Sequence, residues 1–532
     1  MKTTFNILKI ALLIGSAIFL STGVSFAQKY IELLEGSDDI RIDGKTGNYI
    51  VKGNVRFKKE ETMLYCDSAY YNLVTSTVRA FGNIHLNKED TLNMFCDSLF
   101  FDTKKDYAKL YGNVRIRDNE YKLTTDSIDY DLKNNVGVYK NKGVITSISS
   151  SDRLSSDIGY FYPNSKQFNF RKNVVYTSNE FTVKSDTLQF NANAKKAYFY
   201  GPTYITNEGL NMYCEKGWYD LNADVGVLEN NAYIEKEDIR ISSDSLYYSS
   251  KDSIYIAKNN VHIIDTTNKI GFQGDYAIKD NKKGYAYITG HALAKRFEDK
   301  DTLYIHADTL YNYSDSLGKP MLMTAHRNVK LFRGDMQGVC DSLIYDKAKG
   351  EMNMYYEPTL WAQNAQLTSD TITIFEKESR IHRAYLRKNG LVATPVDSTN
   401  YYNQIAGTLM NAYFDSTQIR RVDIEGNAKT LYFLEDEEEN DTAIVVKRQG
   451  MNRIYSSNIS LRFVDGDIET ATYRENPEGI VYPISDIDKK EERVDQFIWN
   501  VEKRPLSWQD MIYSNEERKM ILDLWRRMMK FV

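Results

Sequence analysis

The sequence repeats itself with a period close to 30 residues, and this repeat constrains the fold more than any other feature. Successive copies carry the acidic residues Asp67, Asp97 and Asp126, which lie 30 and 29 residues apart. Each copy also carries a glycine-asparagine pair, as at Gly53-Asn54 and Gly82-Asn83. A fixed period of this length is typical of stacked-repeat architectures.

Within one copy the apolar residues alternate with polar ones, which predicts a strand and not a helix. Residues 78–86 alternate in this way, a polar turn follows at 87–90, and residues 95–101 alternate again. Each copy is therefore predicted to be a hairpin of two long strands. Glycine, asparagine and aspartate in the middle of the strands indicate a bend. We expect an all-β fold: an elongated β-jellyroll, or folded-over antiparallel sheet, of about 30-residue hairpins with a short C-terminal helical tail.

Apolar residues recur at fixed offsets from the two bends, which we call corners, and these rows predict the lining of the folded-over sheet. The rows also include Thr359 and Trp361, two and four residues after Glu357. For an arbitrary repeat protein, such rows more often form a filled core than an open trough. The lining residues singled out as candidates for lipid binding are Phe57, Ile84, Leu86, Leu99, Phe101, Val114, Ile116, Ile128, Tyr130, Leu188, Phe190, Ile205, Ile234, Leu246, Ile263, Leu331 and Leu343.

The first 27 residues are predicted to be a cleaved secretory signal. Lys2 and Lys9 precede a short apolar run, and Ser25-Phe26-Ala27 matches the small-x-small cleavage pattern. We therefore expect an exported protein in the periplasm, with the outer or the inner membrane as candidate places of association. The net charge of −5 gives no support to nucleic acid as a partner.

The rest of the chain divides into three predicted parts. Residues 28–375 form regular repeats, and residues 376–475 form degenerate terminal repeats with longer loops. The acidic run 435–439 is predicted to be one such solvated loop. Residues 476–532 are predicted to be a charged linker and an amphipathic helix at 514–532, which either docks on a membrane or partner or packs over the sheet.

The four cysteines, Cys66, Cys96, Cys214 and Cys340, directly precede the acidic corner, where other copies carry serine, threonine, glycine or alanine. The slot accepts small residues, so cysteine is best explained by its size. A disulfide between Cys66 and Cys96 stays open as the alternative in an oxidising compartment.

The sequence offers no catalytic constellation and no metal-ligand pattern. Of the scattered histidines, His85, His262 and His291 stand at or near the first corner of separate repeats and are best read as exposed strand residues. One carboxylate per repeat favours local hydrogen bonding at the corner over calcium binding. We therefore predict neither enzymatic activity nor a cofactor.

The hairpins Gly53-Asn54-Val55 to Asp67-Ser68-Ala69-Tyr70-Tyr71-Asn72, and the two copies that follow, resemble the OstA family. This family comprises periplasmic lipopolysaccharide-transport proteins, including LptA and the N-terminal domain of LptD. The resemblance is clear over roughly residues 30–375 and looser to about 475. It implies a trough that shields the acyl chains of lipopolysaccharide, and it implies edge-strand pairing with other transport components into a bridge between membranes.

The expected function is therefore a non-enzymatic lipopolysaccharide or lipid A carrier. A filled β-solenoid acting as a scaffold or surface adhesin is the alternative, and a polysaccharide-processing enzyme is a distant third. Lining size discriminates the first two, since a filled core needs interdigitating bulky side chains. The small lining residues expected to leave room are Gly159, Gly217, Ala232, Ala277, Ala292 and Ala294.

Overall fold

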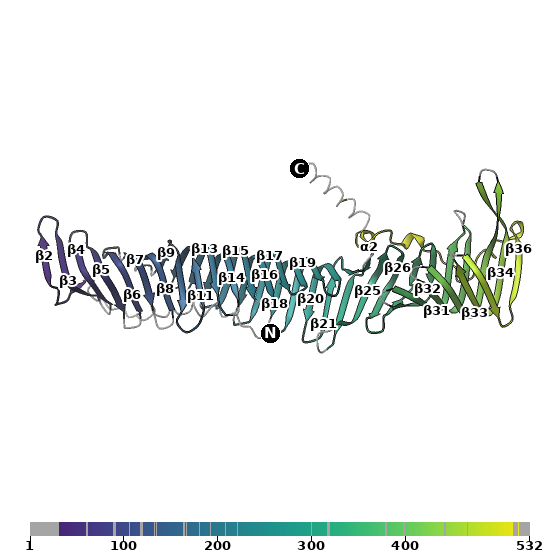
Figure 1. Ribbon diagram of the computed structural model, residues 1–532, viewed down its shortest axis with the longest axis horizontal. Coiled ribbons are helices and arrows are strands. Elements are labelled where there is room, and N and C mark those ends of the chain that lie inside the picture. Colours follow the sequence, from purple (N-terminus) through teal and green to yellow (C-terminus); the bar gives the residue numbers. More distant parts are fainter. Residues whose placement is uncertain are drawn as a thin grey trace. The chain divides into compact units, whose positions relative to one another are not determined.

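The computed structural model describes residues 31–513 and Met520, apart from short gaps (Figure 1). The predicted signal peptide lies outside these residues, and so does the predicted helix of 514–532 except for Met520. Within the described part of the chain, no helix is long and apolar enough to cross a bilayer. The gaps are 60–61, 89–91, 106, 118–120, 132–133, 135, 163–164, 166, 180, 192, 208, 221, 250, 299–300, 316–319, 378–379, 397–399, 416–417, 441–442 and 465–466.

The chain forms two compact units, residues 1–255 and 256–532, and the strands of each pair antiparallel with strands one to three places away in the sequence. The predicted all-β class is confirmed, while the predicted boundaries at 375 and 475 stay predictions. The strands of the first unit are β1 Glu32–Leu33, β2 Asp39–Asp43, β3 Asn48–Lys59, β4 Thr62–Asn72, β5 Thr77–Lys88, β6 Leu92–Asp102, β7 Tyr107–Arg117, β8 Tyr121–Asp131, β9 Val136–Tyr139, β10 Gly143–Ser147, β11 Arg153–Ser156, β12 Ile158–Tyr162, β13 Gln167–Thr177, β14 Thr182–Asn191, β15 Lys196–Asn207, β16 Leu210–Asp220, β17 Val225–Lys236 and β18 Ile239–Ser249.

The second unit continues the same pattern and ends in short helices. Its elements are β19 Ile254–Asp265, which begins at the boundary, β20 Ile270–Asp280, β21 Tyr285–Thr289, β22 Leu293–Phe297, β23 Thr302–His306, β24 Thr309–Ser314, β25 Pro320–Arg333, β26 Met336–Asp346, β27 Glu351–Tyr355, β28 Thr359–Ala362, β29 Ala365–Thr368, β30 Thr371–Lys377, β31 Arg380–Pro395, β32 Tyr402–Asp415, β33 Gln418–Asn440, β34 Ala443–Val464, β35 Asp467–Arg474, β36 Glu478–Pro483, the 3-10 helices η2 Ile484–Asp486 and η3 Val501–Lys503, and the helix α2 Gln509–Ile512.

The corners are β-bulges in which two residues face one. Lys52 pairs with Ser68 and Val55 pairs with Cys66, so that Gly53-Asn54 lies opposite the single residue Asp67. Gly53 and Asn54 have φ of 73° and 47°, a left-handed conformation that glycine and asparagine adopt most readily. Repeated in every hairpin, the bulge bends each strand at the same place, which folds the sheet over.

A side-chain hydrogen bond links neighbouring corners, as predicted for the acidic residues. Asn83 donates its Nδ2–H to the Asp67 carboxylate at 2.9 Å. A Cβ on the adjacent Gly82 would lie 2.3 Å from the same carboxylate, so glycine is needed there for close approach. The same bond recurs at Asn113–Asp97, Asn173–Asp157, Asn231–Glu215, Asn328–Asp308 and Asn389–Asp370.

The small-residue slot before each corner acid also makes a bond that the sequence analysis missed. The Ser156 and Ser185 hydroxyls donate to the carbonyl two residues further on, at 3.0 and 3.1 Å. The Cys340 thiol makes the equivalent contact at 3.3 Å. The slot therefore holds a short side chain, which adds this hydrogen bond where it carries a donor and makes none at Gly274 and Ala307.

Two local predictions in the second unit are wrong. The acidic run 435–439 lies in β33, paired with residues 444–448 of β34, and not in a loop. The other error concerns Trp361. Tyr356 and Glu357 have positive φ, so the corner lies one residue earlier than assumed, and Leu360 faces the interior while Trp361 faces outward. A one-residue slip reverses every side chain of a strand.

Candidate functional site

The interior of the first unit is lined by an unbroken row of apolar side chains, one from each strand from β3 to β18 except β9 and β12. Because each member pairs directly with the next, the row runs along the sheet from β3 to β18. We call it the first row: Phe57, Leu64, Leu86, Met94, Ile116, Leu123, Ile145, Leu154, Tyr176, Val183, Ile205, Met212, Ile234 and Ile241.

A second row lies on the other side of the corners, and in much of it aromatic and small residues alternate. The ring of Tyr130 lies against Gly137, where a Cβ would come within 3.2 Å, and Tyr219 lies in the same way against Gly226. The second row consists of Tyr49, Tyr71, Val78, Phe101, Ala108, Tyr130, Gly137, Phe161, Phe168, Phe190, Ala197, Tyr219, Gly226 and Tyr248.

Members of both rows belong to one apolar cluster, so the two walls of the folded-over sheet pack on each other. Next to the corners the interior is closed: Ile84 and Val114 are both buried. Farther from the corners the burial varies along the sheet. Leu86 and Ile116 are half-buried and keep part of their surface open, and Met212, Ile234 and Ile241 do the same.

Between these two stretches the interior is filled by aromatic rings. The rings of Tyr139, Phe161, Phe168, Phe170 and Phe190 are buried and form a chain of contacts with centroids 5.9–6.3 Å apart. Tyr176 packs on Phe181 at 5.7 Å in the first-row wall. We call these seven residues the aromatic collar.

Tyr139 explains why small residues leave no room in the collar. A Cβ on Gly143 or Gly159 would lie 2.4 Å from its ring, so the tyrosine occupies the space that both glycines vacate. Its hydroxyl lies 2.6 Å from Ser156 Oγ, and burial raises the pKa of Tyr139 to about 12. The expectation that Gly159 leaves open space is therefore wrong, and the space beside Gly217 is taken by the Val227 carbonyl.

Lys59 marks the open side of the first stretch. Its ammonium lies 5.1 Å from the centre of the Phe101 ring, although the two residues belong to different walls. A cation over an aromatic face is attracted to it. The first half-open stretch thus combines an apolar interior with a positive charge at its rim.

The predicted lining residues fall into two groups. Half-buried, and so with surface left for a ligand, are Leu86, Phe101, Ile116, Tyr130, Ile234 and Ile263. Buried in the packed interior are Phe57, Ile84, Leu99, Val114, Ile128, Leu188, Phe190, Ile205, Leu246, Leu331 and Leu343.

Comparison with known protein families matches residues 29–186 to the model described as OstA-like protein. This segment is thus similar to the OstA-like family. The resemblance inferred from the hairpin motifs is thereby confirmed for β1 to β13 and the first half of β14. A search of curated protein sequences found no match.

One solved structure that matches is LptH of Pseudomonas aeruginosa, described as the LptA-homologous periplasmic component of the lipopolysaccharide transport device. The sequence identity is 14%, and the alignment covers 28% of this chain and 95% of LptH with a TM-score of 0.21. The first half-open stretch lies inside the OstA-like segment, whereas Met212, Ile234 and Ile241 follow it.

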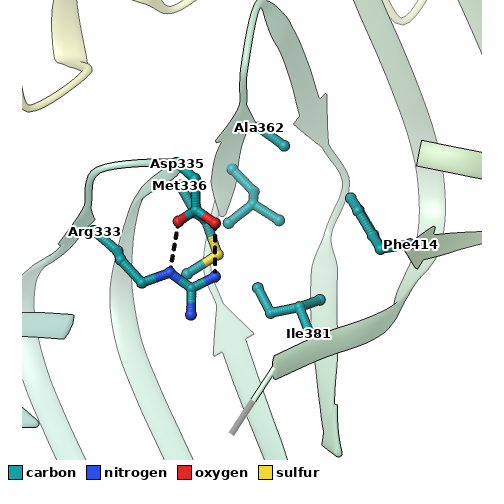
Figure 2. A pocket seen from close by; sticks show the side chains of 7 residues that line it. Arg333, Asp335, Met336, Ala362, Ile381 and Phe414 are labelled. Atoms are coloured by element: carbon teal, nitrogen blue, oxygen red, sulfur yellow. Dashed lines mark hydrogen bonds and ion pairs between the residues drawn. The ribbon is translucent and has the colours of Figure 1, made fainter. Parts of the chain in front are cut away.

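Most of the second unit, in contrast, has a closed interior, and Ile263 near its start is an exception. Leu331, Leu343, Met354, Ile372 and Leu386 have no exposed surface. A cavity of about 10 Å³ lies beside Met336, Leu360, Ala362, Ile381 and Phe414, next to the Arg333–Asp335 ion pair (Figure 2). Such a cavity holds about one water molecule and is far smaller than a typical ligand pocket.

An ionic cluster joins the two walls of this unit. Arg296 of β22 donates two hydrogen bonds to Glu376 of β30, at 3.0 and 2.8 Å, and also bonds Glu298. The Tyr345 hydroxyl donates to the same Glu376 carboxylate at 3.2 Å. Because β22 follows a glycine-histidine corner and β30 follows an acidic one, the cluster ties the opposite walls together.

Residues 484–513, which we call the strap, run back across the outer face of the second unit. Val494 is buried against Leu391, Ala393 and Ala406, and farther along Met511 and Ile512 pack on Leu293. The predicted charged linker therefore begins with β36 and continues as a packed segment. The strap covers this face of the sheet, and this cover accounts for the burial of the outward-facing Trp361.

Three buried glutamines hold the strap, and sequence analysis gave no signal for them. Gln404 donates to the Glu492 carbonyl and accepts from the Val494 N–H, at 2.8 and 2.9 Å. Gln366 makes the same pair of bonds with Ile498 and Asn500, both at 2.8 Å. Gln337 accepts from Arg504 at 2.8 Å. Glutamine recurs at outward positions of β26, β29 and β32, and this recurrence could have indicated that another segment of the chain is hydrogen-bonded along that face.

The cysteines and histidines do not form a reactive site in the described part of the chain. All four cysteines are free and buried, so Cys66 and Cys96 form no disulfide. Burial raises the pKa of each thiol to about 12. Among the described residues no three histidine, cysteine or acidic side chains converge as a metal site would require.

Proposed function

We propose that the protein is a non-enzymatic lipid carrier of the periplasm that shields acyl chains of lipopolysaccharide in the trough of its first unit. The observation that carries this proposal is the first row, in which each apolar member pairs directly with the next. Several of its members are half-buried, and no member carries a charged side chain. An apolar trough of this kind removes hydrocarbon from water without covalent chemistry. The OstA-like assignment of residues 29–186 supports the same ligand class.

The proposed route into a bridge is pairing at the outermost strands. In β2 the side chains of Ile40 and Ile42 are 50% and 60% exposed, and in β36 those of Ile480 and Val481 are 54% and 62% exposed. Exposed apolar edge strands are ready templates for strand addition. We propose other components of lipopolysaccharide transport as the partners, and the 514–532 segment as a candidate contact with a membrane or partner.

The test is photo-crosslinking in cells with a photoreactive residue at Ile116, on the first row. The matched control carries it at Arg115, the neighbour on the exposed outer face. A lipopolysaccharide adduct at Ile116 alone is the expected result. No adduct at either position, in exported and folded protein, would refute the carrier function.

A second function, that of a scaffold, is favoured by the second unit alone. Its interior is filled and its walls are tied by the Arg296–Glu376 cluster, which is what a rigid spacer requires. We propose that this unit contributes length and attachment and carries no lipid. The same crosslinker placed at Met410 should then give no lipid adduct.

A further inference from the structure

The half-open positions of the first row are not distributed evenly. Leu86, Met94 and Ile116 are half-buried on β5, β6 and β7, and Met212, Ile234 and Ile241 are half-buried on β16, β17 and β18. The six members between them, from Leu123 to Ile205, are all buried. The second row follows the same division, because Phe101, Ala108 and Tyr130 are half-buried at one end and Gly226 and Tyr248 at the other.

From this division we infer that the first unit holds two separate acyl-chain sites, with the aromatic collar between them. The inference rests on the proposed carrier function and deepens it, since the trough then is not one continuous channel. Site one comprises Leu86, Met94 and Ile116 with Phe101 and Tyr130. Site two comprises Met212, Ile234 and Ile241 with Tyr248.

The collar separates the sites because its rings leave no path for a chain. Tyr139 occupies the space of Gly143 and Gly159, and Phe168 packs on Phe161 and Phe190 from successive strands. On the first-row wall Tyr176 and Phe181 are in contact, and both are buried. Close-packed interiors do not deform continuously, so passage requires several rings to move together.

The occupant of site one is the acyl portion of an anionic lipid. The three strands span about 10–15 Å along the sheet at about 4.8 Å per strand. Lys59, which lies over Phe101 at the rim, supplies a positive charge where the polar headgroup would leave the trough. An amphipathic anion matches both features, whereas an uncharged apolar ligand would use only the interior.

The experiment measures lipid stoichiometry by native mass spectrometry of the full exported chain, with tetra-acylated lipid A as the probe. The variants are Ile116→Asp, Ile234→Asp and the double variant. A charged carboxylate at either position disfavours the binding of an acyl chain, and both positions are only half-buried, so the fold can accept the substitution. Arg115→Asp and Glu235→Ala, on the outer face, are the matched controls. Circular dichroism checks the fold, and Ile116→Ser and Ile234→Ser replace any variant that fails it.

At saturating lipid, the expected result is two bound lipids on the wild-type chain and on both controls. Each single variant should bind one lipid, and the double variant should bind none. One lipid on the wild type that either single variant abolishes would mean a continuous trough, and would overturn the two-site inference while leaving the carrier function intact. No lipid on the wild type would refute the carrier function itself, and with it the inference.

Discussion

Arg296 and Glu376, which are 80 residues apart in the sequence, form a bidentate ion pair between the two opposite walls of the second unit. The Glu376 side chain is 7% exposed, so the pair is largely removed from water. Buried ion pairs contribute little net stability but are costly to break on one side, because the remaining charge is left without a partner.

The first prediction follows from that cost. Glu376→Gln should lower the free energy of unfolding by about 1–3 kcal/mol, because Arg296 loses the charged partner of two hydrogen bonds and keeps only the Glu298 carboxylate. Urea titration monitored by circular dichroism measures the change. Asp415→Asn removes an exposed partner of Arg420 and should cost less than about 1 kcal/mol. If the two variants lost the same free energy of unfolding, the Arg296–Glu376 pair would not be the buried link between the two walls that is described above.

A second prediction concerns the corner at Asn83, where φ is 43°. Asn83→Ala should lower the free energy of unfolding by about 1–2 kcal/mol, because alanine is strained in this region and the bond to Asp67 is lost. Asn83→Gly loses the same bond without the strain and should cost about half as much. If the glycine variant is as unstable as the alanine variant, the hydrogen bond and not the backbone sets the requirement.

The third prediction is a loss of stability at alkaline pH through the four cysteines. Burial raises the thiol pKa from 9.0 to about 12 in the folded state, so the unfolded state loses its protons first as the pH rises. The stabilisation by the neutral thiols is therefore complete below pH 9 and is lost as the pH rises from 9 towards 12. At pH 9.5 the loss should reach up to about 1 kcal/mol per thiol.

Denaturation midpoints at pH 7.5 and 9.5 measure this effect. A variant with serine at Cys66, Cys96, Cys214 and Cys340 is the control, because serine occupies the same slot in other repeats. It should show a smaller pH dependence than the natural chain. An identical pH dependence would mean that other groups, such as the buried tyrosines, are responsible.

The fourth prediction tests the strap. Gln404→Leu keeps the side-chain size but leaves the buried Val494 N–H without an acceptor, at a cost of about 1–3 kcal/mol. Hydrogen exchange at Val494 should accelerate by roughly 10- to 100-fold. Gln418→Leu, on the exposed face of β33, should leave this exchange rate unchanged. Unaltered protection of Val494 in the Gln404 variant would show that packing alone holds the strap.

The repeated part of the fold was predictable because the residues of each hairpin determine its strands and its bends locally. Alternation fixed the strands, and the Gly-Asn and Asp corners fixed the bends, since both act over a few residues. At Trp361 the same method failed, because a corner without glycine or asparagine at the expected position cannot be located from the residues alone. The outward burial of that tryptophan comes from the strap, which is distant in sequence.

The site was predictable to a lesser degree. The first row follows from the period, so the candidates Leu86, Ile116 and Ile234 were found. Whether a lining position is open depends on its neighbours on both walls, as with Tyr139, which fills the space of two glycines. The residue types alone could not reveal the collar.

The strap makes the order of chain synthesis matter. Lys330 donates to the carbonyl of Met511, which lies 181 residues later. Strands can join the sheet almost one after another as the chain is delivered, since each pairs with strands at most three places away in the sequence. The outer face of β22 to β32 stays uncovered until the last residues arrive. A nascent chain is thus distinguishable from a finished one by an exposed apolar surface, the kind of surface that chaperones and proteases recognise in unfinished proteins.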